Sequence, residues 1–143
     1  MNLQDPVSTI MSTHLITVQP DDKMQKVKDI MEDNDIHHVL VCKSNKLVGM
    51  ISQTDLSHFL KGVSYDSYQD IMNSVRLKNY NAEEVMTEYL ECISADDTIQ
   101  KALEIFGKNK FHAIPIVKDN DEIEGIVTTF DIVNMLLETI PQS

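Results

Sequence analysis

Two short segments of the chain each place a hydroxyl and a carboxylate three residues apart. They read Ser52-Gln-Thr-Asp55 and Thr128-Thr-Phe-Asp131, and each follows an apolar run. This spacing is typical of a helix N-terminus, where both side chains accept hydrogen bonds from backbone N–H groups that lack a helical partner. The same groups could hold a nucleotide, because a helix N-terminus receives phosphate and a carboxylate can bind both ribose hydroxyls. A cap alone and a nucleotide site are therefore both compatible with the pattern.

Histidines precede both segments at matching places. His37 and His38 stand ahead of the first segment, and His112 stands ahead of the second. An imidazole donates a hydrogen bond and gains a positive charge in mildly acidic solution, so these side chains suit a phosphate group. A partly buried histidine bonded to a backbone carbonyl fits the pattern equally well. A metal site that joins His37 and His38, with His14 or His58 as a further ligand, to Asp55 is disfavoured, because adjacent side chains on a strand diverge.

These groups belong to an internal repeat that covers most of the chain. Residues 11–45 align with residues 86–120 at an offset of 75, and residues 47–56 align with residues 123–132 at an offset of 76. About a quarter of the aligned positions are identical, which chance seldom produces over this length. Two copies are too few for a solenoid, so we expect two similar units related by a pseudo-two-fold axis.

Apolar periodicity predicts the elements of each copy. Short strands are expected at residues 15–18 and 90–93, followed by Asp-rich turns whose carboxylates begin a helix. Two apolar strands joined by a hairpin turn come next, and an amphipathic helix ends the copy. The predicted order is strand, helix, strand, strand, helix. Residues 61–81 are predicted to form a loop with a helical turn or a longer helix, to which we assign no function.

Composition excludes several classes of function. The 143 residues carry a net charge of −11, which argues against nucleic-acid polymers and anionic membrane surfaces. No apolar run reaches the roughly 18 to 20 residues of a membrane span, and the N-terminus lacks a secretory signal, so we expect no membrane insertion and a cytoplasmic location. Cys42 and Cys92 form no Cys-x-x-Cys pair. No catalytic motif occurs, so we expect no enzyme activity and no catalytic residues.

The doubled pattern resembles a tandem pair of CBS domains, the Bateman module. The resemblance rests on the paired methionines Met11 and Met86, the Asp-Asp turns, the histidines and the two Gly-x-x-Ser/Thr-x-x-Asp segments. It covers residues 6–61 as a first unit and 78–139 as a second, with 62–77 as the connecting segment. It implies an α/β fold of two pseudo-symmetric β-α-β-β-α units packed through their sheets, and a homodimer.

The resemblance also implies a regulatory function. Many members bind adenosine-containing ligands in clefts between the two units and signal by a conformational or dimer rearrangement. We therefore expect AMP, ADP or ATP as the ligand, with which a magnesium ion could enter, and no resident cofactor. Because no further domain is recognised in the sequence, we expect a partner protein to be regulated in trans. The alternatives are a ligand-free structural or protein-interaction module, and a sensor of S-adenosylmethionine or of a metal.

The resemblance assigns residues to two predicted clefts. In the first, an apolar wall and a hydroxyl suit adenine, and we favour this cleft. In the second, Glu91 opposes phosphate while the paired histidines attract it. Cleft one is predicted to combine Ile16 and Thr17 with His112, Ile126, Thr128 and Asp131. Cleft two is predicted to combine Cys92 with His37, His38, Met50, Ser52, Thr54 and Asp55.

Overall fold

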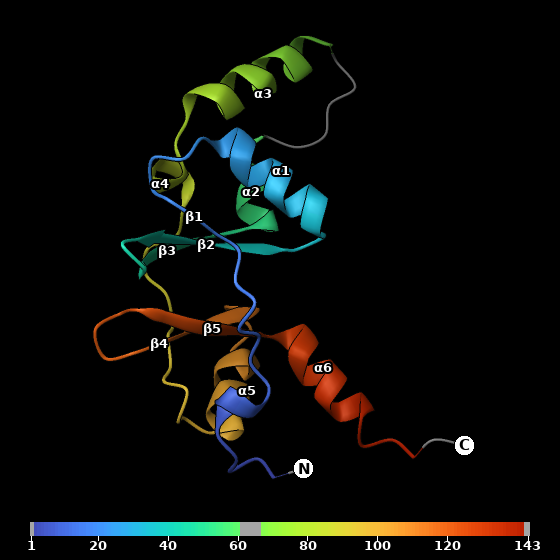
Figure 1. Cartoon of the computed structure of the whole chain (residues 1–143). Helices are drawn as coiled ribbons and strands as arrows, with labels where there is room; N and C mark the ends of the chain where they lie inside the picture. Colours follow the sequence, from blue (N-terminus) through green and yellow to red (C-terminus); the bar gives the residue numbers. More distant parts are fainter. Residues whose placement is uncertain (1, 61–66, 142–143) are drawn as a thin grey trace. The chain divides into compact units, whose positions relative to one another are not determined.

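A computed structural model describes residues 2–60 and 67–141, as a mixed α/β fold with two small sheets (Figure 1). The elements follow one another in the order short helix, strand, helix, two strands, four helices, two strands, helix. Their bounds are η1 Val7–Thr9, β1 Thr17–Val18, α1 Met24–Asn34, β2 His38–Lys43, β3 Lys46–Ser52, α2 Gln53–Phe59, α3 Ser67–Asn79, α4 Ala82–Val85, α5 Ile99–Gly107, β4 Ala113–Val117, β5 Ile123–Thr128 and α6 Thr129–Leu137.

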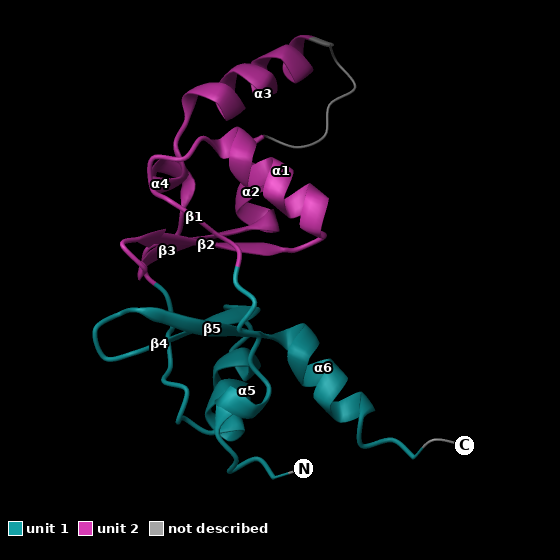
Figure 2. Ribbon diagram, in the orientation of Figure 1, with its two compact units in different colours: residues 1–15, 90–143 teal, residues 16–89 magenta. Residues whose placement is uncertain are grey.

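The chain divides into two compact units (Figure 2). Unit 1 comprises residues 1–15 and 90–143, and unit 2 comprises residues 16–89. The N-terminal segment thus packs with the second copy of the repeat. The backbone of Ser12 pairs with that of Ile126 in unit 1, and Thr87 pairs with Met50 in unit 2. Each compact unit therefore takes its first segment from the other copy, so the units cut across the repeat boundaries.

Unit 2 is built on a three-stranded sheet in the order β1-β2-β3. Strand β1 is parallel to β2, and β2 is antiparallel to β3. Helices α1 and α2 lie on one face of this sheet (Figure 1). The core forms because the apolar stripe of α1, which includes the fully buried Val27, packs with buried strand residues such as Val39 and Ile51. Helix α3 packs beside α1 and buries Leu77, which confirms a helix in the connecting segment.

Unit 1 repeats this plan with a smaller sheet. Strands β4 and β5 are antiparallel, and the core gathers Val7, Ile93, Ile114 and Ile116. The strand expected at residues 90–93 is reduced to one parallel bridge between Ile93 and Ile116, so that prediction was too long. The first copy also keeps only Thr17 and Val18 of the expected strand 15–18.

The first helix of each copy begins later than the Asp-rich turns predict. The Asp22 carboxylate accepts a hydrogen bond from the Gln19 N–H at 2.7 Å, and Asp97 accepts one from the Ser94 N–H at 2.8 Å. Both carboxylates thus close the turn before the helix and do not cap the helix itself. Thr98 caps α5 instead, accepting a bond from the Lys101 N–H at 3.1 Å. The expected carboxylate caps were wrong, because the turn competes for the same side chain.

Both predicted hairpin turns are present. Ser44 and Asn45 join β2 to β3 in the left-handed region, with φ values of 52° and 64°. Two such residues twist a short hairpin in the sense that its strands require. Asp121 has a φ of 67° in the turn between β4 and β5.

Candidate functional site

A complete capping box begins the last helix of each copy. At α2, the Asp55 N–H donates to Ser52 Oγ at 3.0 Å, and the Ser52 N–H donates to Asp55 Oδ2 at 2.8 Å. At α6, the Thr128 N–H donates to Asp131 Oδ2 at 2.8 Å, and the Asp131 N–H donates to Thr128 Oγ1 at 3.3 Å. The capping interpretation of the Ser/Thr-x-x-Asp segments is therefore confirmed in both units.

The capping bonds engage one oxygen of each carboxylate. Asp55 and Asp131 each accept through Oδ2, and no hydrogen bond to either Oδ1 is recorded among residues 2–60 and 67–141. Both side chains are only half-buried. An ionised carboxylate has about four lone-pair sites, so each can serve as a cap and still accept a ligand hydroxyl. The cap and the ligand site are thus compatible functions of the same residue.

The backbone places a histidine beside each capping box. The carbonyl of His37 accepts a bond from the Gln53 N–H at 2.8 Å, and the carbonyl of His112 accepts one from the Thr129 N–H at 3.1 Å. His38 stands opposite Ser52 in the β2–β3 register. The side chains of His37 and His112 are exposed, and that of His38 is half-buried. The backbone therefore brings a histidine and a capping box to the same end of the sheet in each unit.

Other predicted residues lie in rows across the two sheets. In unit 2, Thr17 pairs with Leu40, which pairs in turn with Met50. In unit 1, Ile126 pairs with Pro115, whose carbonyl accepts a bond from the N–H of Ile93, the residue after Cys92. Thr17, Thr54 and Cys92 are exposed, Ile16 and Ile126 are half-buried, and Met50 is buried.

The predicted clefts draw on both compact units. Unit 2 holds Ile16, Thr17, His37, His38, Met50, Ser52, Thr54 and Asp55, whereas unit 1 holds Cys92, His112, Ile126, Thr128 and Asp131. The structure therefore brings together the histidine and capping-box residues of each unit. The pairing of Ile16 and Thr17 with Asp131, and of Cys92 with Asp55, stays a prediction.

The two cysteines differ in their surroundings. Burial raises the pKa of the Cys42 thiol. The pKa of the exposed Cys92 thiol is raised by partial desolvation, and then by the carboxylates of Asp121 and Glu91. Cys92 therefore stays a neutral thiol over a wider pH range than an unstructured cysteine, because desolvation and then the negative charges nearby disfavour the thiolate. A neutral, polarizable side chain at this place suits an uncharged ligand group better than a phosphate.

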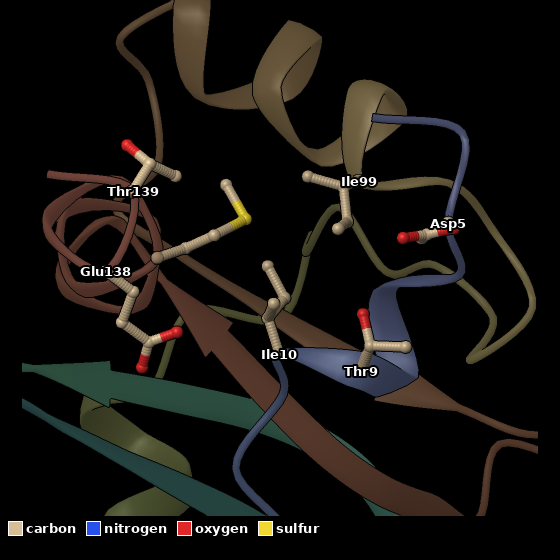
Figure 3. Close-up of a pocket in the computed structure, with 7 residues that line it drawn as sticks. Asp5, Thr9, Ile10, Ile99, Glu138 and Thr139 are labelled. Atoms are coloured by element: carbon tan, nitrogen blue, oxygen red, sulfur yellow. The ribbon is translucent and has the colours of Figure 1, made fainter. Parts of the chain in front are cut away.

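Sequence reasoning missed a hollow in unit 1 (Figure 3). It has a volume of about 300 Å³ and lies between the N-terminal segment, the start of α5 and the end of α6. Its lining comes from places far apart in the sequence, so no local motif marks it. The lining residues are Asp5, Thr9, Ile10, Ile99, Met135, Glu138 and Thr139.

The described part of the chain also bears on metals and membranes. Within residues 2–60 and 67–141, no three side chains of His, Cys, Asp or Glu gather in a way that could hold a metal ion. No helix of those residues has the length and apolar character needed to cross a bilayer.

Comparison with known proteins gives a consistent picture. The family model for the CBS domain matches residues 7–62 and 82–138. The chain is 28% identical over 133 residues to a homoserine O-acetyltransferase of Methanohalobium evestigatum (strain ATCC BAA-1072 / DSM 3721 / NBRC 107634 / OCM 161 / Z-7303). That match covers 92% of this chain and 24% of the enzyme, so the chain spans about a quarter of that relative's length.

Solved structures share the fold. The structure of CBSX2 in complex with AMP superposes with a TM-score of 0.80 at 19% identity, covering 96% of this chain and 99% of that one. The CBS domain pair of protein MJ0100, in complex with 5-methylthioadenosine and S-adenosyl-L-methionine, superposes with a TM-score of 0.73 at 22% identity. That match covers 94% of this chain and 98% of the other.

Proposed function

The chain belongs to the CBS domain family, as a tandem pair, and on that premise we propose that it is a regulatory module that binds an adenosine nucleotide. CBS pairs are regulatory ligand-binding modules, and solved relatives hold AMP, S-adenosyl-L-methionine or 5-methylthioadenosine. The proposal names AMP, ADP or ATP for this chain and assigns it no catalytic step.

One observation carries the proposal. In both units a half-buried aspartate is held in a capping box by one oxygen, while its other oxygen has no hydrogen bond recorded in the described residues. Asp55 and Asp131 are thus oriented by the backbone before any ligand arrives. A ribose presents two adjacent hydroxyl donors, and a fixed carboxylate can accept both without losing further side-chain entropy. A ligand without a ribose would lack these two adjacent donors.

The phosphate is assigned to the histidines and hydroxyls. His37, His38 and Ser52 would act in unit 2, because they lie at one helix N-terminus. In unit 1 His112 would act with Thr128, whose hydroxyl donates to Asp131 Oδ2 at 3.1 Å and would have to turn from it toward the phosphate. The dipole at such a terminus and the imidazole donors oppose the acidic charge of the whole chain. Magnesium would help by neutralising the phosphates. The remaining predicted contacts, to the base and sugar, are Ile16, Thr17, Met50, Thr54, Cys92 and Ile126.

The signal is proposed to pass through self-association and a regulated partner protein. The outer face of α6 exposes Phe130, Val133, Leu136 and Leu137, with exposed fractions of 50% to 68%, and Ile140 follows. The aligned positions 54 and 57 in α2 are threonine and serine. A two-fold interface uses the same patch on both copies, so this apolar stripe would be covered in a homodimer, to which we assign it. A ligand would act by binding one packing arrangement more tightly than another.

Calorimetry with a ligand panel tests the proposal. AMP, ADP, ATP and S-adenosylmethionine are titrated into the protein with and without Mg²⁺. We expect saturable heat with at least one adenine nucleotide. Asp55→Asn and Asp131→Asn keep an oxygen for the cap but lose the charge, and we expect one or both to weaken binding about tenfold or more.

The α4 capping box supplies a matched control. At the start of α4 the Asn81 N–H donates to Glu84 Oε1 at 3.0 Å, as in the other two boxes, and neither residue belongs to a predicted cleft. Glu84→Gln changes a capping carboxylate in the same way and should leave affinity unchanged. Absence of heat for every ligand would overturn nucleotide sensing and favour a ligand-free interaction module. Heat with S-adenosylmethionine alone would replace the nucleotide with that ligand.

A further inference from the structure

The hollow of unit 1 lies where unit 2 carries a pair of aromatic rings. The Ile99 N–H donates to the Asp5 carbonyl at 3.0 Å, and the Met24 N–H donates to the Tyr80 carbonyl at 2.9 Å. These equivalent bonds place Tyr80 where unit 1 has Asp5, and the repeat places Phe59 where unit 1 has Met135. In unit 2 the rings of Phe59 and Tyr80 pack edge to face, with centroids 5.4 Å apart.

Replacement of this aromatic pair leaves space in unit 1. Asp5 and Met135 supply less volume than a tyrosine and a phenylalanine, and a cavity of about 300 Å³ is found between them. Its floor is apolar, with Ile99 only 2% exposed and Met135 9% exposed. Ile10 also lines it and lies near Ile99 in Figure 3. Ligand pockets in proteins begin at about this volume. Unit 1 therefore has a hollow where unit 2 has packed aromatic rings.

The polar groups around the hollow only accept hydrogen bonds. The Thr9 hydroxyl donates its proton to the Pro6 carbonyl at 2.8 Å, and the Thr139 hydroxyl donates to the Leu136 carbonyl at 2.6 Å. Because a hydroxyl has one proton, neither can donate to a ligand. Asp5 and Glu138 add two carboxylates, and neither forms an ion pair within the described residues. Figure 3 shows them entering from different segments.

The surroundings of the hollow disfavour an anion. The α5 N-terminus borders the hollow, but its first N–H groups are occupied: Ile99 bonds to the Asp5 carbonyl, Gln100 to the Leu3 carbonyl and Lys101 to Thr98. No lining residue carries a positive charge. Glu138 is the C-cap of α6, where the negative end of the helix dipole attracts cations. The helix dipole, the lining charges and the surplus of acceptors therefore all favour a cation.

We propose that this hollow binds a small aliphatic diammonium ion, with its carbon chain on Ile10, Ile99 and Met135 and one charged end at each of the two carboxylates, Asp5 and Glu138. An ammonium group carries donors only, which complements a rim of acceptors only. The apolar floor selects an amine with a hydrocarbon body over a simple metal ion. The proposal is independent of nucleotide binding, because none of these residues belongs to the capping-box sites.

Methyl NMR with matched probes tests the proposal. 1,5-Diaminopentane is titrated into the whole chain, labelled at the isoleucine methyl groups, beside 1-pentanol and pentanoate as neutral and anionic controls. We expect saturable shifts of the Ile10 and Ile99 methyls with the diamine only, while Ile51 in unit 2 stays unchanged. Asp5→Asn and Glu138→Gln should each weaken the diamine about two- to fivefold, as for a partly exposed ion pair.

Two further variants make the outcome decisive. Asp5→Tyr with Met135→Phe installs the aromatic pair of unit 2 and should abolish the shifts while the fold persists. Asp29→Asn removes an exposed carboxylate from α1 in unit 2 and should leave the affinity for the diamine unchanged. Equal shifts with 1-pentanol, equal weakening by Asp29→Asn, or no saturable shift in the millimolar range would each overturn the proposal.

Discussion

Met11 lies directly against Gly125. A Cβ atom at Gly125 would stand 2.8 Å from Met11 Sδ and 2.9 Å from the carbonyl oxygen of Ser12. The equivalent pair in unit 2 is Met86 and Gly49. Each glycine of the Gly-x-x-Ser/Thr-x-x-Asp pattern therefore admits the first segment of the other copy onto the strand that leads to the capping box.

Alanine at these glycines should destabilise the protein unequally. At Gly125 the clash includes a backbone oxygen, which cannot move aside, so we expect Gly125→Ala to cost about 1 to 3 kcal/mol. At Gly49 the nearest atoms all belong to the Met86 side chain, which can rotate, so Gly49→Ala should cost less. Urea denaturation measures both.

Gly107 provides the control for that series. It ends α5, and a Cβ atom there would meet nothing within 4 Å. Gly107→Ala should therefore be neutral or stabilise by up to about 1 kcal/mol. If Gly125→Ala proves no more destabilising than Gly107→Ala, the close contact with Ser12 does not constrain the strand.

Loss of the capping hydroxyls should weaken the helices that carry the proposed site. Ser52→Ala and Thr128→Ala each remove the acceptor for the N–H of an aspartate three residues on, and we expect a loss of about 1 kcal/mol of unfolding free energy for each. Threonine at position 52 and serine at position 128 should restore most of it. An unchanged denaturation midpoint for the alanine variants would show that the hydroxyls are not structural caps.

The α6 stripe should control self-association. Phe130→Thr with Val133→Ser gives α6 the residues that α2 carries at the aligned positions. We expect the double variant to weaken dimerisation at least about a hundredfold in sedimentation velocity, because two large apolar side chains lose their burial. Ile71→Ser removes an equally exposed apolar residue from α3 and should not change the mass. A monomeric wild-type protein would contradict the assignment.

Alkylation of Cys92 should depend on pH in a defined direction. Because desolvation and the carboxylates of Asp121 and Glu91 raise the pKa of this thiol, iodoacetamide should react with a midpoint above the ordinary value of about 8.5. Because the pKa of Cys92 is higher in the folded than in the unfolded protein, the thiol proton stabilises the fold at pH values below the unfolded pKa. This stabilisation is lost as the pH rises through the folded pKa. Asp121→Asn should move the midpoint down, and Asp119→Asn should not, in a Cys42→Ala background. A midpoint at or below the ordinary value would contradict the shift.

The fold was predictable because the repeat aligns residues that share a physical function. The doubled Ser/Thr-x-x-Asp spacing predicted both capping boxes, and the apolar stripe of residues 24–31 predicted the core face of α1. The competition between turn and helix for the same carboxylate was not predictable. Asp22 and Asp97 accept bonds from the turn before the helix, although their positions in the sequence suit a helix cap.

Features that depend on long-range contacts could not be predicted from the sequence. Residues 1–15 pack with the second copy of the repeat, and this depends on tertiary contacts such as the backbone pairing of Ser12 with Ile126. The hollow depends on Asp5 and Met135 replacing an aromatic pair that is itself visible only once Phe59 and Tyr80 are seen in contact. The repeat located His37, His38 and His112, while their pairing with the residues that would contact the base stays a prediction.

The most direct test of the central claim compares AMP with its 2′,3′-dideoxy analogue by calorimetry, on the wild-type protein, Asp55→Asn and Asp131→Asn. A carboxylate that binds ribose hydroxyls should make the wild-type protein prefer AMP about tenfold or more, since hydrogen bonds to a charged group are at stake. That preference should shrink in the aspartate variant whose site is occupied. Equal affinity for both nucleotides, or a preference that survives in both variants, would contradict the account.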